Sequence, residues 1–241
     1  MSASRSWTGR GSRRGCSPTP PPRGTPGRHG LAVRSADSFP TVIDSALPPV
    51  PDVELALTLG DTTFDLRWRA LVGAVIPTPR FGRESEVLAT VRAAGQAGAD
   101  VAVTSLPPRL IGPAARTGSV PIAAKVSSLD AVEAATEVGI ALVLAPADLV
   151  GAAADVGAPV ALLLDDVGEI DAARSAVADL HVPLAIDTSA IPTRDDALAV
   201  ESVAVPLGCR LLCTNDVRRT RRVVEVVAAL LAAQRGPMDR Q

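Results

Sequence analysis

Short apolar runs alternate with segments of helical periodicity from residue 70 to residue 234, and this alternation constrains the fold more than any other feature. Such runs, bounded by Gly, Pro or Asp, predict buried parallel strands. The strands are expected at 70–75, 100–104, 121–125, 141–145, 160–164, 183–187 and 210–214. The helices are expected at 83–96, 110–117, 128–138, 147–156, 170–180, 194–207 and 217–234. Strands and helices that take turns in this way predict an α/β fold with a parallel sheet.

A short hairpin precedes the seven strand–helix units, with strands expected at 53–57 and 63–66 around Gly60-Asp61. Eight such units close a (β/α)8 barrel. The sequence therefore predicts a TIM-type (β/α) barrel with seven recognisable units, in which one unit is either lost or not recognised. An open, doubly wound sheet is the alternative, but the Gly-rich dinucleotide-binding turn of that fold is absent from the sequence.

Residues 1–50 differ in composition from the rest of the chain. The first 34 residues hold seven Arg and no Asp or Glu, among many Pro, Gly and Ser. Such a segment cannot offset its ordering entropy by burying apolar surface, so we predict a disordered tail. A solvated tail, or a start codon assigned too far upstream, is favoured over a tail that binds nucleic acid or anionic lipid. The barrel domain is expected at 51–236, followed by a short tail at 237–241.

Composition argues against several classes of function. The net charge is −2 and only 2% of the residues are aromatic, so neither nucleic acid nor a membrane is an expected partner. Three scattered cysteines, Cys16, Cys209 and Cys213, make no disulfide framework, and a cytoplasmic location is expected. Cys209 and Cys213 are expected on one face of a strand as buried, inert thiols. His29 and His181 are too few for a zinc site.

Several phrases of the sequence occur in a characteristic order and spacing. They are Thr58-Leu-Gly-Asp-Thr-Thr-Phe-Asp-Leu66, Leu71-Val-Gly-Ala-Val75, Ala97-Gly-Ala-Asp-Val101, Val120-Pro-Ile122, Val156-Gly-Ala-Pro-Val160, Gly208-Cys-Arg-Leu-Leu212 and Asn215-Asp-Val217. In this order they resemble the dihydropteroate synthase family of pterin-binding barrels, over about residues 52–234. The resemblance implies a (β/α)8 barrel that joins a pterin methyl diphosphate to an aminobenzoate, using loops at the carboxyl ends of its strands.

The resemblance also implies that most of the family's site residues are replaced. Ile76 stands where the family has the Asn that helps to hold the magnesium diphosphate, and Val103 stands for an Asp of the second strand. Lys125 takes the place of the pterin-binding Asp of the third strand, and Leu144 that of the Asn of the fourth. The Arg-Val-His of the last strand becomes Cys213-Thr-Asn215, without both diphosphate contacts.

Two further positions depend on the register of the alignment. Arg109 is expected to end a strand, as Asp165 and Asp187 are, and it matches an Arg of the second loop only if one residue is dropped. Asp187 is either the pterin-binding Asp of a later strand or part of the strand before the Ser-Arg-Lys of the family, in which case Ser189 is kept. In both registers the Lys that should lie over the pterin is missing.

None of the side chains is predicted to be catalytic or to bind a metal. The candidate ligand-binding residues are Asp187, Lys125, Arg109, Asn215 and Arg218. Lys125 is the only Lys of the chain, and a pair with Asp165 or Asp187 across the barrel mouth could bind a polar ligand, although a self-neutralising pair is favoured. Arg218 is the first of four Arg at 218–222. This run could bind a phosphate, or it could be a solvated or dimer-facing basic edge, and the second interpretation is favoured.

The sequence therefore predicts a dihydropteroate synthase-like protein related to folate biosynthesis but without synthase activity. Losing several members of a catalytic constellation costs ~10³–10⁶ in rate. Such a protein could bind a pterin-like or phosphate ligand, form a homo-oligomer, or serve as a regulatory or structural partner of an authentic synthase. No cofactor is expected, and Mg²⁺ only if diphosphate binding is retained. The alternatives are an active transferase of the family type, another phosphate-ligand TIM-barrel enzyme that uses Lys125, Asp187 and Arg109, and an assembly protein that acts through its tail.

Overall fold

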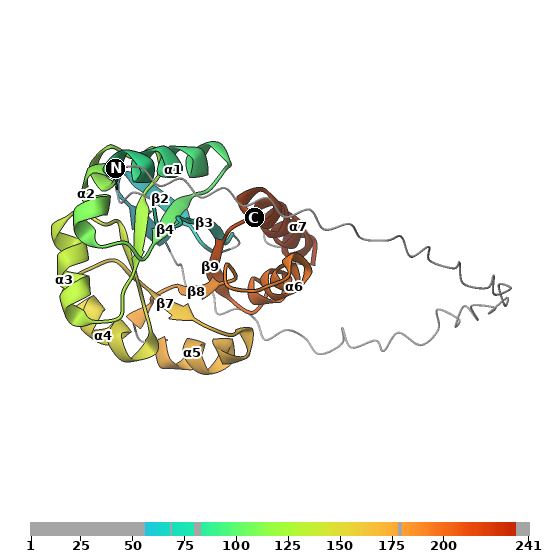
Figure 1. Cartoon of the computed structure of the whole chain (residues 1–241). Coiled ribbons are helices and arrows are strands. Elements are labelled where there is room, and N and C mark those ends of the chain that lie inside the picture. Colours follow the sequence, from blue (N-terminus) through green and yellow to red (C-terminus); the bar gives the residue numbers. More distant parts are fainter. Residues whose placement is uncertain (1–55, 68, 80–82, 178–179, 235–241) are drawn as a thin grey trace, which may run out of the picture. The chain divides into compact units, whose positions relative to one another are not determined.

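The computed structural model describes residues 56–67, 69–79, 83–177 and 180–234 (Figure 1). The predicted tails at 1–50 and 237–241, with Cys16 and His29, lie outside the described residues. The elements in chain order are β1 (Ala56–Leu59), β2 (Thr62–Asp65), β3 (Leu71–Val75), α1 (Glu84–Gln96), β4 (Val101–Thr104), α2 (Pro108–Thr117), β5 (Ile122–Lys125), α3 (Leu129–Glu137), β6 (Leu142–Ala145), α4 (Ala147–Asp155), β7 (Val160–Leu164), η3 (Val167–Glu169), α5 (Ile170–Val177), β8 (Leu184–Asp187), α6 (Arg194–Ala204), β9 (Cys209–Thr214) and α7 (Val217–Gln234). Within the described part of the chain, no helix is long and apolar enough to cross a membrane.

Strands β3 to β9 form a closed, parallel barrel in the order of the sequence. The ring closes where β3 pairs with β9, with Leu71 opposite Leu211 and Ala74 opposite Thr214. Figure 1 shows the helices arranged around the ring of strands. The predicted α/β fold with seven strand–helix units is therefore confirmed, and the open doubly wound sheet is wrong. The seven strands close the ring by themselves, so the described barrel has no place for an unrecognised eighth strand.

The inside of the ring is filled by alternate residues of the strands, as the period of a strand requires. A barrel of seven strands is narrower than one of eight, because the diameter grows with strand number. Small and large inward residues therefore share the interior. The small ones are Gly73, Ala123, Ala161 and Ala185, and the large ones are Leu71, Val101, Leu142, Leu144 and Leu211. A Cβ atom on Gly73 would lie 2.7 Å from Val103 Cγ2, so the interior has no room even for one methyl group there.

The hairpin β1–β2 covers the amino-terminal end of the barrel. The paired strands extend further into the turn than the predicted ranges 53–57 and 63–66. Leu59 pairs with Thr62, and Gly60 in the turn between them has a φ of +60°. Leu59 and Leu66 are 1% and 0% exposed and pack in the same cluster as the inward residues of the barrel. Part of the predicted first strand, at 53–55, lies outside the described residues.

The helices begin and end close to where the sequence predicts. Ser128 Oγ accepts a hydrogen bond from the Ala131 amide at the start of α3, and Asp216 Oδ1 accepts one from the Arg219 amide at the start of α7, as expected of N-caps. Gly98, with φ at +94°, follows α1. One predicted helix extended too far, since α6 ends at Ala204. The described part of α5 ends at Val177, and residues 178–179 lie outside the described residues.

A bulge in β9 separates the two cysteines that were expected on one face. Leu184 of β8 pairs with Cys209, but the next residue of β8, Ala185, pairs with Leu211, so Arg210 is one extra residue. Cys209 therefore packs in the outer core with the helices and Cys213 in the barrel interior, and the same-face prediction is wrong. Both thiols are buried, and burial raises the pKa of Cys209 to about 11 and also raises that of Cys213, as suits inert thiols.

A charged cluster at Asp100 ties α7 to the strands β3 and β4. The Asp100 carboxylate accepts hydrogen bonds from Arg221 at 2.6 Å, from Arg69 at 3.1 Å and from the backbone amide of Val72 at 2.8 Å. Arg221 also donates to the carbonyl of Gly98. The Asp100 and Arg221 side chains are 11% and 16% exposed, so this pair is mostly removed from water.

Candidate functional site

An ion pair spans the carboxyl-terminal mouth of the barrel. Lys125 is the last residue of β5 and Asp187 the last residue of β8, and both follow an inward alanine by two positions, so both point into the ring. Lys125 Nζ donates a hydrogen bond to Asp187 Oδ2. Since β6 and β7 lie between the two strands, the pair joins separate parts of the ring rather than neighbours.

Both partners remain in reach of small molecules, because the side chains of Lys125 and Asp187 are 18% and 20% exposed. Asp187 Oδ1 also accepts a hydrogen bond of 3.0 Å from the Ser189 amide. Partial burial opposes ionisation of Asp187, but the hydrogen bonds from Lys125 and Ser189 outweigh burial, and the pKa of this carboxyl is lowered. The Asp187 carboxyl is therefore ionised at neutral pH.

Three other positions where the resemblance replaces a polar residue are apolar and buried. Val103 and Leu144 are fully buried in the barrel interior, whereas Ile76 is buried in the outer core at 6% exposure. The side chain of Ile76 offers no oxygen ligand where the family has its Asn, so this position does not fit a magnesium diphosphate. In the part of the chain that the structure describes, no three His, Cys, Asp or Glu side chains come together as a metal site.

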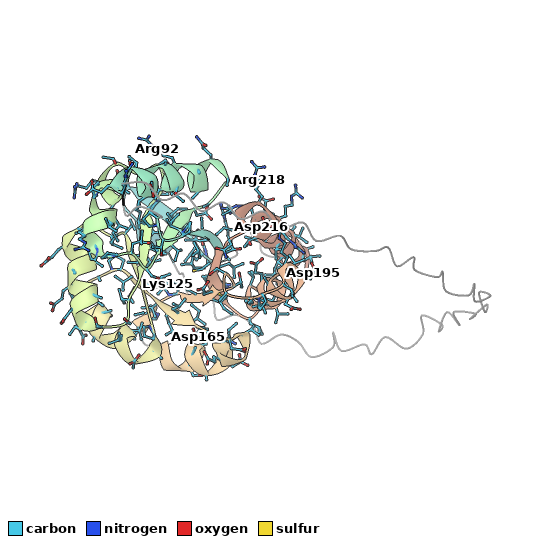
Figure 2. All side chains as sticks on the ribbon, viewed as in Figure 1. Arg92, Lys125, Asp165, Asp195, Asp216 and Arg218 are labelled. Carbon is cyan, nitrogen blue, oxygen red and sulfur yellow. The ribbon has the colours of Figure 1, made fainter. Side chains whose placement is uncertain are left out.

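The remaining candidate residues are distributed around the rim. Asn215 follows β9, is exposed, and donates from Nδ2 to the Ser189 carbonyl at 2.9 Å, which places it next to the loop that holds Asp187. Arg109 is an exposed residue in the first turn of α2 rather than at a strand end. Arg218 is exposed in the first turn of α7, near Asp216 in Figure 2. For neither arginine do the described residues include an ion pair or a hydrogen bond with Lys125 or Asp187.

Two other residues of the basic run have structural partners. Arg219 donates to Asp195 at the start of α6 at 2.8 Å, and Arg221 belongs to the Asp100 cluster. These contacts favour the interpretation of the run as a structural edge, at least for these two residues. Asp165, which follows β7, is exposed, and Lys125 pairs with Asp187 instead.

A pocket of about 430 Å³ lies beside the mouth, between the loops that follow β8 and β9. Most of its lining side chains carry a hydroxyl, an amide or a charge: Thr188, Ser189, Thr193, Arg194, Glu201, Thr214, Asn215, Asp216, Arg219 and Thr220. Barrel enzymes often bind phosphate groups at the loops after their last two strands. The pocket therefore has the position and the polarity of a small-ligand site.

Glu201 of α6, on the wall of this pocket, was not predicted from the sequence. It is only 3% exposed, and its Oε1 accepts hydrogen bonds of 2.9 Å from Thr188 Oγ1 and from Thr220 Oγ1. Thr220 Oγ1 in turn lies 3.0 Å from Thr214 Oγ1. The one sequence signal that could have indicated a buried carboxylate was its position. Glu201 lies at helical spacing between Ala197 and Val205, on the face of the helix that packs inward.

Stability should depend on the protonation of Glu201. Burial raises the pKa of this carboxyl above its usual 4.5. Its favourable contribution is therefore fully present below the unfolded-state pKa and is lost as the pH rises through the raised folded-state pKa. We expect Glu201→Gln, which stays neutral, to gain stability relative to the unaltered protein as the pH increases.

Urea unfolding between about pH 4 and pH 8 measures this difference. The matched control is Glu225→Gln, because Glu225 is exposed on α7 and its substitution should leave the pH profile unchanged. Parallel profiles for the unaltered protein and Glu201→Gln would show that Glu201 does not titrate in the accessible range.

Fold and site together define a TIM-like barrel of seven strand–helix units, with an amino-terminal hairpin and an ion pair at its mouth. It resembles solved structures of dihydropteroate synthases, so the chain is a distant structural relative of that family. The Yersinia pestis enzyme is 17% identical with a TM-score of 0.56, over 75% of this chain and 100% of the other. The Vibrio fischeri enzyme is 15% identical with a TM-score of 0.56, over 76% and 99%.

The enzyme from Xanthomonas albilineans, solved with indole-2-carboxylic acid and 6-chloroguanine, is 17% identical with a TM-score of 0.54, over 77% and 100% of the two chains. No family model and no curated protein matches the sequence. At these identities the likeness establishes the fold of the barrel and leaves its activity open.

Proposed function

We propose that this protein is a dihydropteroate synthase-like barrel that lacks synthase activity and keeps a ligand-binding or partner role related to folate biosynthesis. The observation that supports the proposal is the Lys125–Asp187 ion pair. In the alignment, Lys125 replaces a pterin-binding Asp, and Asp187 is a candidate for another. The cation at the first position thus engages the carboxylate at the second.

The charges at the mouth argue against the family reaction. A pterin ring is recognised by carboxylates that accept its N–H groups, and an ammonium group offers only donors. The diphosphate, in turn, requires charge-matched donors, whereas Ile76 and Val103 are buried apolar residues. Catalysis of the family type would need both sets of contacts in the transition state.

Calorimetry of the full chain with a pterin methyl diphosphate and Mg²⁺, together with an aminobenzoate turnover assay on the same sample, tests the proposal. We expect no product above background and no binding at micromolar ligand, with an authentic synthase as the positive control. Turnover would overturn the proposal. Micromolar binding without turnover would support a ligand-sensing relative.

The polar pocket between the β8 and β9 loops favours a second candidate, a different phosphate-ligand TIM-barrel enzyme. Of the residues first assigned to that function, Lys125 and Asp187 are paired, while Arg109 stands on α2. A titration with inorganic phosphate tests the second candidate. This candidate requires the pocket to bind phosphate, and the result does not depend on whether the barrel mouth binds a pterin. Replacing Arg219, which lines the pocket, by Ala should then weaken phosphate binding.

We extend the proposal to a protein partner, either a second copy of this chain or an authentic synthase, in the cytoplasm. Large apolar side chains on α6 and α7 are exposed to solvent: Val203 at 50%, Val226 at 58% and Leu230 at 59%. Exposed apolar residues on adjacent helices are typical of contact surfaces. Light scattering of the calorimetry sample reports whether the protein is a dimer by itself.

A further inference from the structure

The polar pocket beside the mouth has a buried carboxylate at its inner end. Glu201 is one of the residues that line the pocket, although it is only 3% exposed. The hydrogen bonds from Thr188 and Thr220 both end at Oε1, so Oε2 remains for a ligand, and the Thr214 hydroxyl also lies beside the carboxylate. Burial raises the pKa of Glu201 more than these hydroxyl groups lower it, so its negative charge is incompletely compensated.

Two arginines lie at the outer end of the pocket. Arg194 is exposed at the start of α6, and among the described residues its side chain has no ion-pair or hydrogen-bond partner. Arg219 also lines the pocket and donates to Asp195, the next residue of α6 (Figure 2). The Asp195 side chain is 92% exposed. Because such an exposed ion pair contributes little, Arg219 can exchange this partner for a ligand anion.

The helix α6 connects the two ends of the pocket. Arg194, Ala197, Leu198 and Glu201 follow one another at helical spacing and line the same pocket, so they share one face of the helix. The rise of the helix places the backbone positions of Arg194 and Glu201 about 10 Å apart along its axis. The helix wall between them is apolar, because Ala197 and Leu198 carry no polar side-chain group.

We infer that this pocket binds a small aliphatic ω-amino acid, whose ammonium group pairs with Glu201 and whose carboxylate pairs with Arg194 and Arg219. The ammonium group would supply the positive charge that the buried carboxylate lacks. The spacing along α6 requires a short methylene chain between the two charges, rather than the single carbon of an α-amino acid. The pocket volume of about 430 Å³ lies within the usual range for small-ligand sites.

This inference goes beyond the proposed function and does not rest on it, because it requires neither a pterin nor a protein partner. It also differs from the phosphate-ligand candidate. Inorganic phosphate would bind only at the outer end, at Arg194 and Arg219, since a buried carboxylate repels an anion. Glu201 is therefore the residue that separates the two assignments.

Calorimetric titration of the full-length chain near pH 7 with 5-aminopentanoate tests the inference. Two half-ligands, pentanoate and 1-aminopentane, measure what each end of the molecule contributes. We expect 5-aminopentanoate to bind about tenfold more tightly than either half-ligand, because each of these lacks one of the two charge pairs. 4-Aminobenzoate should bind more weakly than 5-aminopentanoate, since its aromatic amine is uncharged at this pH.

Two variants assign the ends of the pocket. Glu201→Gln should weaken binding of 5-aminopentanoate about tenfold and leave that of pentanoate unchanged, because the amide has no charge to pair with the ammonium group. Arg194→Gln should weaken binding of both carboxylates, and Arg194 is exposed, so this variant should fold. Glu225→Gln and Arg92→Gln are the matched controls, since both residues are exposed and neither lines the pocket.

The inference fails if 5-aminopentanoate does not bind at millimolar concentration, if pentanoate binds equally well, or if Glu201→Gln leaves the affinity unchanged. Unchanged binding by Arg194→Gln would overturn the role of Arg194. Tighter binding of 4-aminobenzoate would overturn the assignment to an aliphatic ligand. Binding of phosphate without binding of 5-aminopentanoate would leave the phosphate-ligand candidate standing and overturn this inference. The pterin titration is a separate measurement, so its result alters none of these outcomes.

Discussion

Replacing Asp100 by Ala is expected to lower the free energy of unfolding by about 3 kcal/mol, at the lower end of the range for breaking a buried ion pair. The carboxylate accepts hydrogen bonds from Arg221, Arg69 and the Val72 amide. Without it, the mostly buried guanidinium of Arg221 keeps, among the described residues, only its hydrogen bonds to the Gly98 carbonyl. For a protein of this size, the expected fall in melting temperature is roughly 6–12 °C.

Thermal and urea unfolding measure the effect. Asp155→Ala is the matched control, because Asp155 is an exposed residue at the end of α4 and its substitution should stay within about 0.5 kcal/mol of the unaltered protein. If the two variants lost the same stability, the cluster at Asp100 would contribute no more than a surface charge.

Adding one methyl group at Gly73 should destabilise the barrel by about 1–3 kcal/mol, the usual cost of overpacking a core. The new Cβ would lie 2.7 Å from Val103 Cγ2 and 3.3 Å from Leu211 Cδ1, and both neighbours are themselves enclosed by the ring. Neither branched side chain can move aside without displacing another inward residue.

Gly151→Ala is the control for Gly73→Ala, and the two should differ in sign. Gly151 lies within α4, and a Cβ there would have no atom within 4 Å. Ala in a helix is favoured over Gly by about 1 kcal/mol, so this variant should gain stability in the same urea titration. A Gly73→Ala protein as stable as Gly151→Ala would mean that the interior can relax around the added methyl group.

The fold was predictable because its signals are local. Each strand is a short apolar run and each helix has its own periodicity, so neither requires knowledge of distant residues. Closure of a ring by seven strands was not predictable, since the pairing of β3 with β9 joins Leu71 to Leu211. The prediction that Cys209 and Cys213 share a face was wrong for a related reason, because the bulge at Arg210 is defined only by pairing with the neighbouring strand β8.

The candidate site was predictable in part. Lys125 and Asp187 both end parallel strands, and strand ends meet at one face of a barrel, so their proximity followed from the pattern. Arg109 was placed wrongly at a strand end because the loop after β4 gives way to α2 at Pro108. Glu201 escaped prediction because its hydroxyl partners come from three separate segments, which meet only in the folded protein.

The pairing of β3 with β9 has a consequence for synthesis of the chain. During translation, β3 leaves the ribosome about 140 residues before β9, so its hydrogen-bonding edge must wait for the last strand. Until then, any sheet that these strands form has two unpaired edges. Such edges are templates for aggregation, and contacts so distant in sequence form slowly. The first strand of the ring is therefore the one whose protection depends on synthesis of the whole barrel.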